Sequence, residues 1–354
     1  MSRDFFPLTV LDTKDEIGGL AKTVMFDVPE DLAEKFAWRA GQHLSLRVQL
    51  KEGEVRRSYS ISSSPVSGDP LRITVKRVND GLVSNYINDN VAKGDVIDVM
   101  PPFGGFCLDT AQNFRRTHYF FGAGSGITPL FSMLHSVMCN EPHSVAYLAY
   151  GNKNAESILF KDALSKISDD FGRRVGVKHV LSAPSMWSGF KYWRKGIVDE
   201  GAIKALIEEH PPYAQDAQYY VCGPGGMNKA VKVALMSLDV PQDRIHMENY
   251  GGADEIDDTV KGIKATAEIT LNGEQQNVSI GAGQTVLEAV RLAGLRPPFS
   301  CQSGVCGACR ANLTVGTVHM RARMALEDND IKKGRVLTCQ SVPTSEALSI
   351  SYDG

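Results

Sequence analysis

The sequence predicts a chain of several folded parts: an antiparallel β-barrel, a doubly wound α/β domain with a parallel sheet, and a smaller α+β domain. Its 354 residues exceed what one hydrophobic core usually organises. The spacing of apolar residues changes after residues 101–105, from short alternating runs to strands that alternate with helices. Four of the seven cysteines fall within the last 54 residues, which sets that segment apart. We therefore divide the chain into 1–113, 114–250, a linker at 251–262, and 263–354.

The barrel prediction for 1–113 rests on β-rich runs between Thr9 and about Met100. Gly, Asn, Asp and Ser clusters separate these runs, as expected for tight turns. The clearest runs are HLSLRVQL, RRSYSIS and LRITVKRV, and the turn signals lie at 52–53, 67–69 and 79–81. A regular succession of short strands is typical of an antiparallel barrel.

The second part, 114–250, alternates between two patterns. THYFF, SVAYLAYG, VGVKHVLS and QYYVCG have the composition of buried strands, and TPLFSMLHSVM, KDALSKI, AIKALIEE and MNKAVKVALMSL have helical spacing. Strands that alternate with helices predict a parallel sheet of the doubly wound kind.

The last part, 263–354, follows a Gly-rich, acidic segment with little to bury, which we interpret as the linker. Its first two strand candidates flank the turn Asn272-Gly273. Thr285 and Glu288 have the spacing of a capping box at the start of a helix, and Gly294 is placed to end that helix.

The composition is that of an ordinary globular protein, with 43% hydrophobic and 22% charged residues. A formal net charge of −3 provides no basic field, which argues against nucleic acid or an anionic membrane as a partner. The N-terminus has no basic segment followed by an apolar one, and no run of 18 apolar residues occurs. We expect a cytoplasmic protein.

The cysteine spacing is the strongest functional signal. Cys301-x4-Cys306-x2-Cys309 is followed, after 29 intervening residues, by Cys339, which is the ligand spacing of plant-type [2Fe–2S] proteins. Gly304 and Gly307 lie within that loop, where missing side chains let backbone N–H groups approach the cluster sulfurs. A tetrahedral zinc site is the alternative, although zinc sites more often use two separated CxxC pairs.

The run PFSCQSGVCGAC and the later LTCQ give 263–354 a resemblance to a β-grasp plant-type ferredoxin domain. The segment departs from free-standing ferredoxins in charge, because it carries eight acidic and nine basic residues. This departure in charge favours delivery of electrons from the same chain over docking to a separate basic reductase.

The run Arg57-Ser58-Tyr59-Ser60, with Ser63, resembles the RxYSxxS flavin signature of the ferredoxin-NADP reductase superfamily. Alternation along a strand places Arg57 and Tyr59 on one face. The resemblance implies that Arg57 pairs with the flavin diphosphate, that Tyr59 packs on the isoalloxazine, and that Ser60 bonds near its reactive N5. An exposed barrel strand is the alternative interpretation of these residues.

A second segment resembles the diphosphate-binding element of the same superfamily and favours FAD over FMN. A helix N-terminus in this segment would present free N–H groups to the diphosphate. The alternative is a turn followed by a capped surface helix. The residues implied are Val75, Lys76, Gly81, Val83 and Ser84.

The run GAGSGITP after the strand THYFF resembles the GxGxGITP nucleotide element of these reductases. Its glycines permit a tight turn and close approach of a diphosphate. Thr128 is predicted to cap the following helix, and Pro129 to be its first residue. The binding residues implied are Gly122, Gly124, Gly126, Thr128 and Pro129.

The run CGPGGM resembles the CGPxxM motif of the superfamily and implies that Cys222 lies beside the hydride-bearing carbon of the nicotinamide. Cys222 as a small buried apolar residue is the alternative. Gly223, Pro224 and Met227 complete this predicted binding turn. Glu248 and Tyr250 match the acidic and aromatic residues that the family places near the flavin, so the implied catalytic set is Tyr59, Ser60, Cys222 and Glu248.

The order of the three parts resembles reductases of multicomponent oxygenases, including phenylacetyl-CoA epoxidase and 3-ketosteroid hydroxylase reductases. That resemblance implies electron transfer from NAD(P)H through FAD and a [2Fe–2S] cluster to a partner oxygenase. A self-sufficient reductase of small acceptors and a redox-sensing binding module are the competing hypotheses. The choice between NADH and NADPH stays open, because Lys191, Arg194 and Lys195 follow the strand where a 2′-phosphate would be read.

Overall fold

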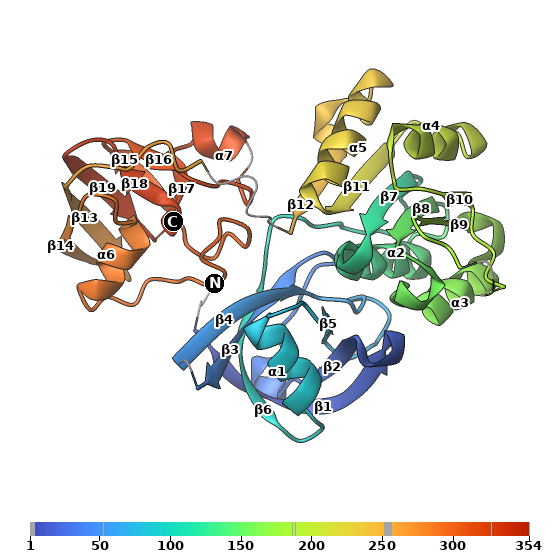
Figure 1. Cartoon of the computed structure of the whole chain (residues 1–354), viewed down its shortest axis with the longest axis horizontal. Coiled ribbons are helices and arrows are strands. Elements are labelled where there is room, and N and C mark those ends of the chain that lie inside the picture. The colour runs from blue at the N-terminus through green and yellow to red at the C-terminus, as the bar shows by residue number, and fades with distance from the viewer. Residues whose placement is uncertain are drawn as a thin grey trace. The chain divides into compact units, whose positions relative to one another are not determined.

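The computed structural model describes residues 4–51, 53–185, 187, 189–250, 257–326 and 328–353 (Figure 1). The chain divides into two compact units, 1–250 and 251–354, and we describe each by itself. No helix in the described ranges is long and apolar enough to cross a membrane.

The first unit begins with an antiparallel sheet in the strand order β4-β3-β6-β1-β2-β5. A bridge between Ile61 and Ile73 joins the two edge strands, so the sheet curls into a barrel. Alternate residues such as Leu44 and Leu46 fill its interior. The elements are β1 (Phe6–Glu16), β2 (Ala21–Asp27), β3 (His43–Leu50), β4 (Gly53–Ser60), β5 (Arg72–Lys76), α1 (Leu82–Asn90) and β6 (Val96–Phe103).

Strand β6 continues through Pro101 and Pro102, where the sequence pattern predicts the end of the barrel strands. Proline donates no backbone hydrogen bond, so within a sheet it is confined to edges and bulges. The register between β3 and β6 shifts between His43 and Ser45, opposite the prolines. This irregularity accommodates the two prolines in a strand that has neighbours on both sides.

The second half of the first unit is a parallel sheet in the order β10-β9-β8-β7-β11-β12, which confirms the doubly wound prediction. Apolar residues of α2 and α3 pack on one face, and those of α4 and α5 on the other. The elements are β7 (Thr117–Ala123), α2 (Ile127–Asn140), β8 (Val145–Asn152), α3 (Lys161–Phe171), β9 (Val175–Leu181), β10 (Arg194–Lys195), α4 (Glu200–Glu209), β11 (Ala217–Gly223), α5 (Gly225–Ser237) and β12 (Ile245–Asn249).

The strand order reverses between β7 and β11, because β8 to β10 lie on one side and β12 on the other. Ligands of open α/β sheets bind at the carboxyl ends of the strands at such a reversal. Gly122 and Cys222 are register partners there. The fold therefore brings both predicted nucleotide motifs to one edge.

The second unit contains a mixed sheet, β14-β13-β19-β15-β17, and a hairpin of β16 with β18. Its elements are β13 (Ala265–Leu271), β14 (Glu274–Ile280), α6 (Val286–Leu292), β15 (Arg310–Val315), β16 (Val318–Met320), α7 (Asp328–Lys332), β17 (Arg335–Leu337), β18 (Ser341–Pro343) and β19 (Ala347–Ser351). The predicted turn at Asn272-Gly273 and the capping box of Thr285 and Glu288 are confirmed. Gly294 lies just beyond α6 with a φ of +85°, as expected of a helix end.

Part of the predicted linker, 251–256, lies outside the described residues. The remainder, 257–262, belongs to the second unit and bonds to residues at the end of β16. The backbone N–H of Asp257 donates to the Arg321 carbonyl at 2.7 Å, and the Arg321 guanidinium pairs with Asp258 at 3.0 Å. The acidic residues that make this segment hydrophilic thus attach it to basic residues around β16.

Candidate functional site

Five predicted residues from separate segments meet at the carboxyl edge of the parallel sheet. The Tyr250 hydroxyl lies 2.6 Å from the Ser60 hydroxyl and 3.1 Å from that of Thr128. A carboxylate oxygen of Glu248 lies 3.5 Å from Ser60 Oγ and 3.9 Å from Cys222 Sγ. Strands β4, β11 and β12 and helix α2 therefore position one polar cluster, which we call the hydride cluster: Ser60, Thr128, Cys222, Glu248 and Tyr250.

Glycines allow the segments of the hydride cluster to approach closely. A Cβ on Gly126 would lie 2.6 Å from the carbonyl carbon of Cys222, so a side chain there would collide with the backbone of β11. A Cβ on Gly122 would lie 2.8 Å from Leu130 Cδ1, and one on Gly223 would lie 2.5 Å from Met227 Cε. Backbone packing therefore requires glycine at Gly126, whereas Gly122 and Gly223 face the flexible side-chain ends of Leu130 and Met227.

The carboxyl group of Glu248 is buried, and burial raises its pKa from 4.5 to about 8, although hydrogen bonds from Ser60 and Cys222 act in the opposite direction. Burial also raises the pKa of the Cys222 thiol well above its ordinary value. Near neutral pH both groups therefore keep their protons. The cluster is therefore nearly neutral, and its members Ser60, Thr128 and Cys222 are buried, which suits transfer of a hydride.

His43 belongs to the same environment, although the sequence motifs do not include it. Its Nδ1 lies 3.9 Å from Glu248 Oε1, and its ring packs edge-on against Phe103 with centroids 4.2 Å apart. A Cβ on Gly104 would lie 2.9 Å from Nδ1. Alternation in β3 gives no signal for it, because Leu44, Leu46 and Val48 are the inward positions and His43 lies on the other face of the strand.

The predicted cap of α2 is wrong. The helix begins at Ile127 after a 3-10 turn over Gly124–Gly126, so Thr128 and Pro129 are its second and third residues. The Thr128 hydroxyl donates to the Ser125 carbonyl at 3.0 Å instead of accepting an N–H. The glycines allow the chain to begin turning earlier than the Thr-Pro pair suggests.

The α2 N-terminus fits an anionic ligand. No described residue caps the helix with a side chain, but the Ile127 N–H bonds the carbonyls of Gly124 and Ser125, and Pro129 has no N–H. The N–H groups that would meet an anion therefore belong mainly to the preceding turn over Gly124–Gly126. Gly124 has a φ of +55°, and its carbonyl accepts from the Tyr150 hydroxyl at 2.9 Å, which fixes the turn. Pro224 is exposed at the neighbouring turn that leads from β11 into α5. This end of the sheet can hold the diphosphate of a dinucleotide.

The predicted flavin residues of the barrel lie on or near β4 and β5. Arg57 is exposed, whereas Tyr59 is largely buried, and burial raises the pKa of Tyr59 despite the nearby Arg57 charge. Lys76 reaches from β5 toward the nucleotide loop, where its Nζ would lie 3.9 Å from a Cβ on Gly124. Two cations from the barrel are thus available for phosphate groups.

The predicted diphosphate element is the start of α1. Gly81 precedes the helix, and no described side chain caps its N–H groups. The Ser84 hydroxyl instead bonds the turn before the helix, accepting from Val78 N and donating to the Gly81 carbonyl. Val75 and Val83 are buried in the barrel core, so they shape the element through packing. Free N–H groups beside a fixed turn fit a diphosphate.

Of the three basic residues that could bind a 2′-phosphate, Arg194 already has a hydrogen-bond partner within the protein. Arg194 Nη1 donates to the Gly201 carbonyl at 2.7 Å. Lys191 and Lys195 are exposed. The residues that directly follow strand β9, 182–187, would also help to choose between NADH and NADPH. One of them, Met186, lies outside the described residues.

The four cysteines of the second unit form two pairs. The Cys306 thiol hydrogen-bonds to Cys301 and lowers the pKa of Cys301 to about 5, and the Cys339 thiol likewise lowers the pKa of Cys309. Backbone N–H groups of Ser303 and Cys306 each donate to Cys301 Sγ at 3.4 Å. In each pair one thiol has a lowered pKa and its partner a raised one, because the two thiols share a hydrogen bond. The arrangement of four cysteines in two pairs fits a two-iron cluster, in which each iron takes two cysteines.

The loop that carries these cysteines is shaped by glycine. Gly304 has a φ of +76°, and its Cβ would lie 2.9 Å from the Ala322 carbonyl oxygen. Its backbone hydrogen-bonds to Cys339, as expected from the sequence. Gly307 has a φ of +71°.

Three family models match the chain. An oxidoreductase FAD-binding domain matches 9–107, an oxidoreductase NAD-binding domain matches 120–233, and a 2Fe-2S iron-sulfur cluster binding domain matches 269–344. They follow the order of the barrel, the parallel sheet and the cysteine-rich unit.

Relatives align with this chain over nearly their whole length. The ferredoxin reductase component of 3-ketosteroid-9-alpha-monooxygenase from Rhodococcus rhodochrous is 33% identical over 94% of this chain and 92% of its own length. A component of 1,2-phenylacetyl-CoA epoxidase from Escherichia coli is 28% identical over 99% of this chain and 98% of its own. The solved structure of phthalate dioxygenase reductase shares the fold, with a TM-score of 0.59, 24% identity and 98% coverage of both chains.

The chain therefore belongs to the family of oxygenase ferredoxin reductase components, and it is an NAD(P)H-dependent oxidoreductase with FAD-binding, NAD-binding and [2Fe–2S]-binding domains.

Proposed function

We propose that this chain passes electrons from NAD(P)H, through FAD and its [2Fe–2S] cluster, to a metal-containing oxygenase component. The observation that carries the proposal is the hydride cluster, in which barrel residue Ser60 meets nucleotide-domain residues Thr128, Cys222 and Glu248 around the Tyr250 hydroxyl. A flavin from the barrel side and a nicotinamide from the sheet side would meet there. The paired cysteines of the second unit supply the next carrier.

Each predicted residue has a role consistent with its position. We assign the flavin diphosphate to Arg57 and to the start of α1, where Gly81, Val83 and Ser84 lie. Val75 of the neighbouring strand β5 would support this element through packing. Tyr59 would pack on the isoalloxazine. Lys76 and the α2 start would hold the nucleotide diphosphate, with Gly122, Gly124, Gly126 and Pro129 shaping the turn. Gly223, Pro224 and Met227 would position the nicotinamide, and Cys301, Cys306, Cys309 and Cys339 would bind the irons.

Bound FAD would supply the conversion between a two-electron donor and one-electron acceptors, and the cluster would supply single-electron transfer. The protein supplies alignment and proton control. Oxidation of one NAD(P)H yields two electrons and one proton, so the proton must find an acceptor as the electrons leave. Glu248, whose pKa is about 8, holds or releases a proton close to neutral pH beside Ser60. The protonated Cys222 thiol adds no charge that would oppose the hydride.

The oxygenase partner is proposed from relatives. The named relatives are reductase components or subunits of a ketosteroid monooxygenase, a phenylacetyl-CoA epoxidase and a glycine betaine monooxygenase, so their acceptors differ. We propose an oxygenase as the electron acceptor. The genes that neighbour this one would indicate the substrate of that oxygenase. We also propose a cytoplasmic location, where NAD(P)H is produced and thiols stay reduced; cell fractionation would test it.

The first experiment is the absorption spectrum of anaerobically purified protein, with iron, zinc and flavin quantified. Flavin and [2Fe–2S] bands that bleach with NADH or NADPH would support the electron route, and comparing the two nucleotides would choose the donor. Zinc in place of iron, or no bleaching with either nucleotide, would refute it.

A second experiment compares the full chain with a chain that lacks 263–354. We expect the shortened chain to keep flavin-level reduction of dyes and to lose delivery to an oxygenase. Full delivery without the cluster domain would instead support a self-sufficient reductase of small acceptors. Slow reduction of every external acceptor by the full chain would favour the redox-sensing module.

A further inference from the structure

Helix α2 carries three hydroxyl side chains at intervals of four residues: Thr128, Ser132 and Ser136. Residues spaced in this way lie on one face of a helix, one turn apart. All three are buried, with exposed fractions of 3% or less. Buried hydroxyls require hydrogen-bond partners, so the face they form has to meet a polar surface.

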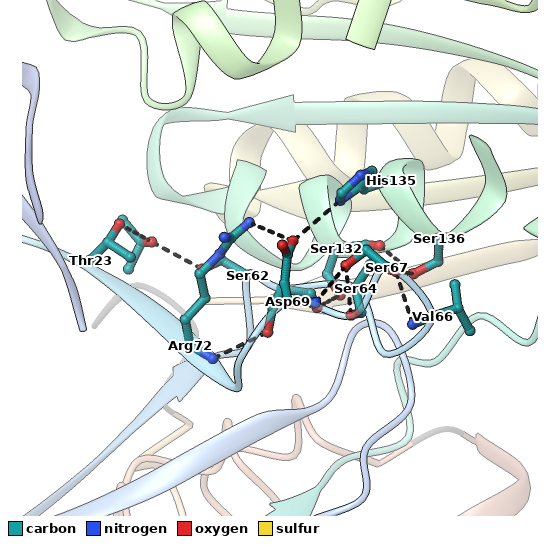
Figure 2. A network of polar contacts seen from close by, with 12 residues as sticks. Thr23, Ser62, Ser64, Val66, Ser67, Asp69, Arg72, Ser132, His135 and Ser136 are labelled. Atoms are coloured by element: carbon teal, nitrogen blue, oxygen red, sulfur yellow. Dashed lines mark hydrogen bonds and ion pairs between the residues drawn. The ribbon is translucent and has the colours of Figure 1, made fainter. Parts of the chain in front are cut away.

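That polar surface is the end of β4 and the loop after it. Thr128 reaches Ser60 through the Tyr250 hydroxyl. One turn later, the Ser132 hydroxyl donates to the Ser63 carbonyl at 2.6 Å. After another turn, the hydroxyl oxygens of Ser136 and Ser64 lie 2.8 Å apart (Figure 2).

The loop after β4 is also bonded to the barrel, so it can fix the position of α2 relative to the barrel. The Trp38 indole N–H donates at 3.2 Å to the same Ser63 carbonyl, and the Arg72 backbone N–H donates to the Ser63 hydroxyl at 3.1 Å. Asp69 lies 3.6 Å from Arg72 Nη2 and 3.9 Å from His135 Nδ1 of α2 (Figure 2). The Trp38 and Arg72 hydrogen bonds therefore fix the barrel side of the contact between α2 and residues 63–64, which we call the joint.

We infer that Ser132 and Ser136 are positioning residues for hydride transfer, which fix the nucleotide-binding helix against the flavin-binding strand through residues 63–64. The inference rests on the proposed function, because it assumes that the flavin and the nicotinamide meet at Ser60 and Thr128. Ser132 lies one turn from Thr128, and Ser63 lies three residues from Ser60. A change in this joint therefore moves the two halves of the hydride cluster relative to each other.

The signature RxYSxxS thus acquires a physical role for its last serine. Ser63 is fully buried, and its carbonyl and hydroxyl bond Trp38, Ser132 and Arg72. These contacts make Ser63 the residue that links the barrel to helix α2. Hydrogen bonds are directional, and misplacing reacting groups by about 1 Å slows a reaction by about a hundredfold.

The test compares Ser132→Ala and the double variant Ser132→Ala with Ser136→Ala against Ser144→Ala in the flavin-loaded full chain. Ser144 is the matched control, because its buried hydroxyl lies 2.6 Å from Glu141 Oε2, away from the barrel. Four quantities are measured: the flavin bleaching rate at saturating NAD(P)H, the nucleotide Kd, the long-wavelength charge-transfer absorption with oxidised nucleotide, and hydrogen exchange of amides 61–70.

We expect the double variant to bleach about ten to a hundred times more slowly, with a weaker charge-transfer band and a Kd within about twofold of the wild type. Exchange at 61–70 should accelerate. The control should keep the wild-type bleaching rate and band. If the double variant does not fold, the same four quantities measured on Ser132→Ala test the inference.

Wild-type bleaching and absorption in the folded variants would overturn the inference and leave the network a stabilising contact. An equal loss in Ser144→Ala would do the same. Failure of the wild type to bleach would instead refute the proposed function, so the two failures are distinguishable.

Discussion

Replacing Gly126 with alanine should show whether glycine is needed there for its backbone conformation or for the lack of a side chain. Gly126 has an ordinary helical backbone, with a φ of −61°, so its glycine is not required by conformation. It is required by space, since a Cβ would lie 2.6 Å from the Cys222 carbonyl carbon and closer still to the oxygen. Ordinary contact begins at 3.4 Å, so the α2 turn and β11 must separate by at least the difference, about 0.8 Å.

Thr128 lies two residues after Gly126, so displacement of the turn moves the Thr128 hydroxyl away from the Tyr250 hydroxyl. Overpacking of this kind costs about 1–3 kcal/mol. A displacement near 1 Å slows a reaction by about a hundredfold. We therefore expect Gly126→Ala to fold with a lower thermal midpoint and to show flavin bleaching by NAD(P)H slowed by about that factor.

Gly226→Ala is the matched control for stability. Gly226 lies in the first turn of α5, within the other nucleotide motif, and apart from its chain neighbours and the helix backbone no atom of the described residues lies within 4 Å of its Cβ position. Alanine in a helix is more stable than glycine by about 0.5–1 kcal/mol, so the midpoint should stay level or rise. A Gly126→Ala protein with a wild-type midpoint and bleaching rate would refute the packing argument.

Three further predictions follow from the charges, cysteines and caps. Because burial raises the pKa of Glu248 to about 8, the stability from its native proton is complete below about pH 4.5 and is lost as the pH rises through about 8. Thermal midpoints from about pH 5 to about pH 9 should therefore fall less in Glu248→Gln than in the wild type, and an equal fall would contradict the burial. Cys339→Ser should lose the [2Fe–2S] absorption and half of the bound iron or more, whereas exposed Cys139→Ser should keep both; an intact spectrum in Cys339→Ser would exclude it as a ligand. Thr285→Ala should destabilise the second unit by about 1 kcal/mol in denaturant unfolding, because the capping box is lost, and no change would show that the cap is redundant.

Patterns that act over a few residues were predictable from the sequence. The turn at Asn272-Gly273 and the capping box at Thr285 depend on neighbours within four residues, and the structure confirms both. The fold class also followed from local periodicity, since β3 and β7 to β9 lie where the alternating and apolar runs place them. The cysteine loop was equally visible, because its ligands crowd into nine residues.

Features that depend on distant packing were not predictable. His43 joins the hydride cluster through Glu248, which is more than 200 residues away, so no local pattern connects them. The start of α2 was misplaced because Gly126 packs on Cys222, and this contact favours an earlier turn than Thr128-Pro129 indicates. The role of Ser63 needed the position of α2.

Tyr250 is also the last residue of the first unit, which has a practical consequence for dissecting the protein. Its hydroxyl bonds Ser60 and Thr128, and its main chain continues directly into residue 251. A protein truncated after Tyr250 would carry a new terminal carboxylate two residues from the buried Glu248. Such a fragment would report the damage done by an added negative charge as well as the loss of the cluster. Truncation after residue 262 avoids this confusion, because the tyrosine keeps a peptide bond on both sides.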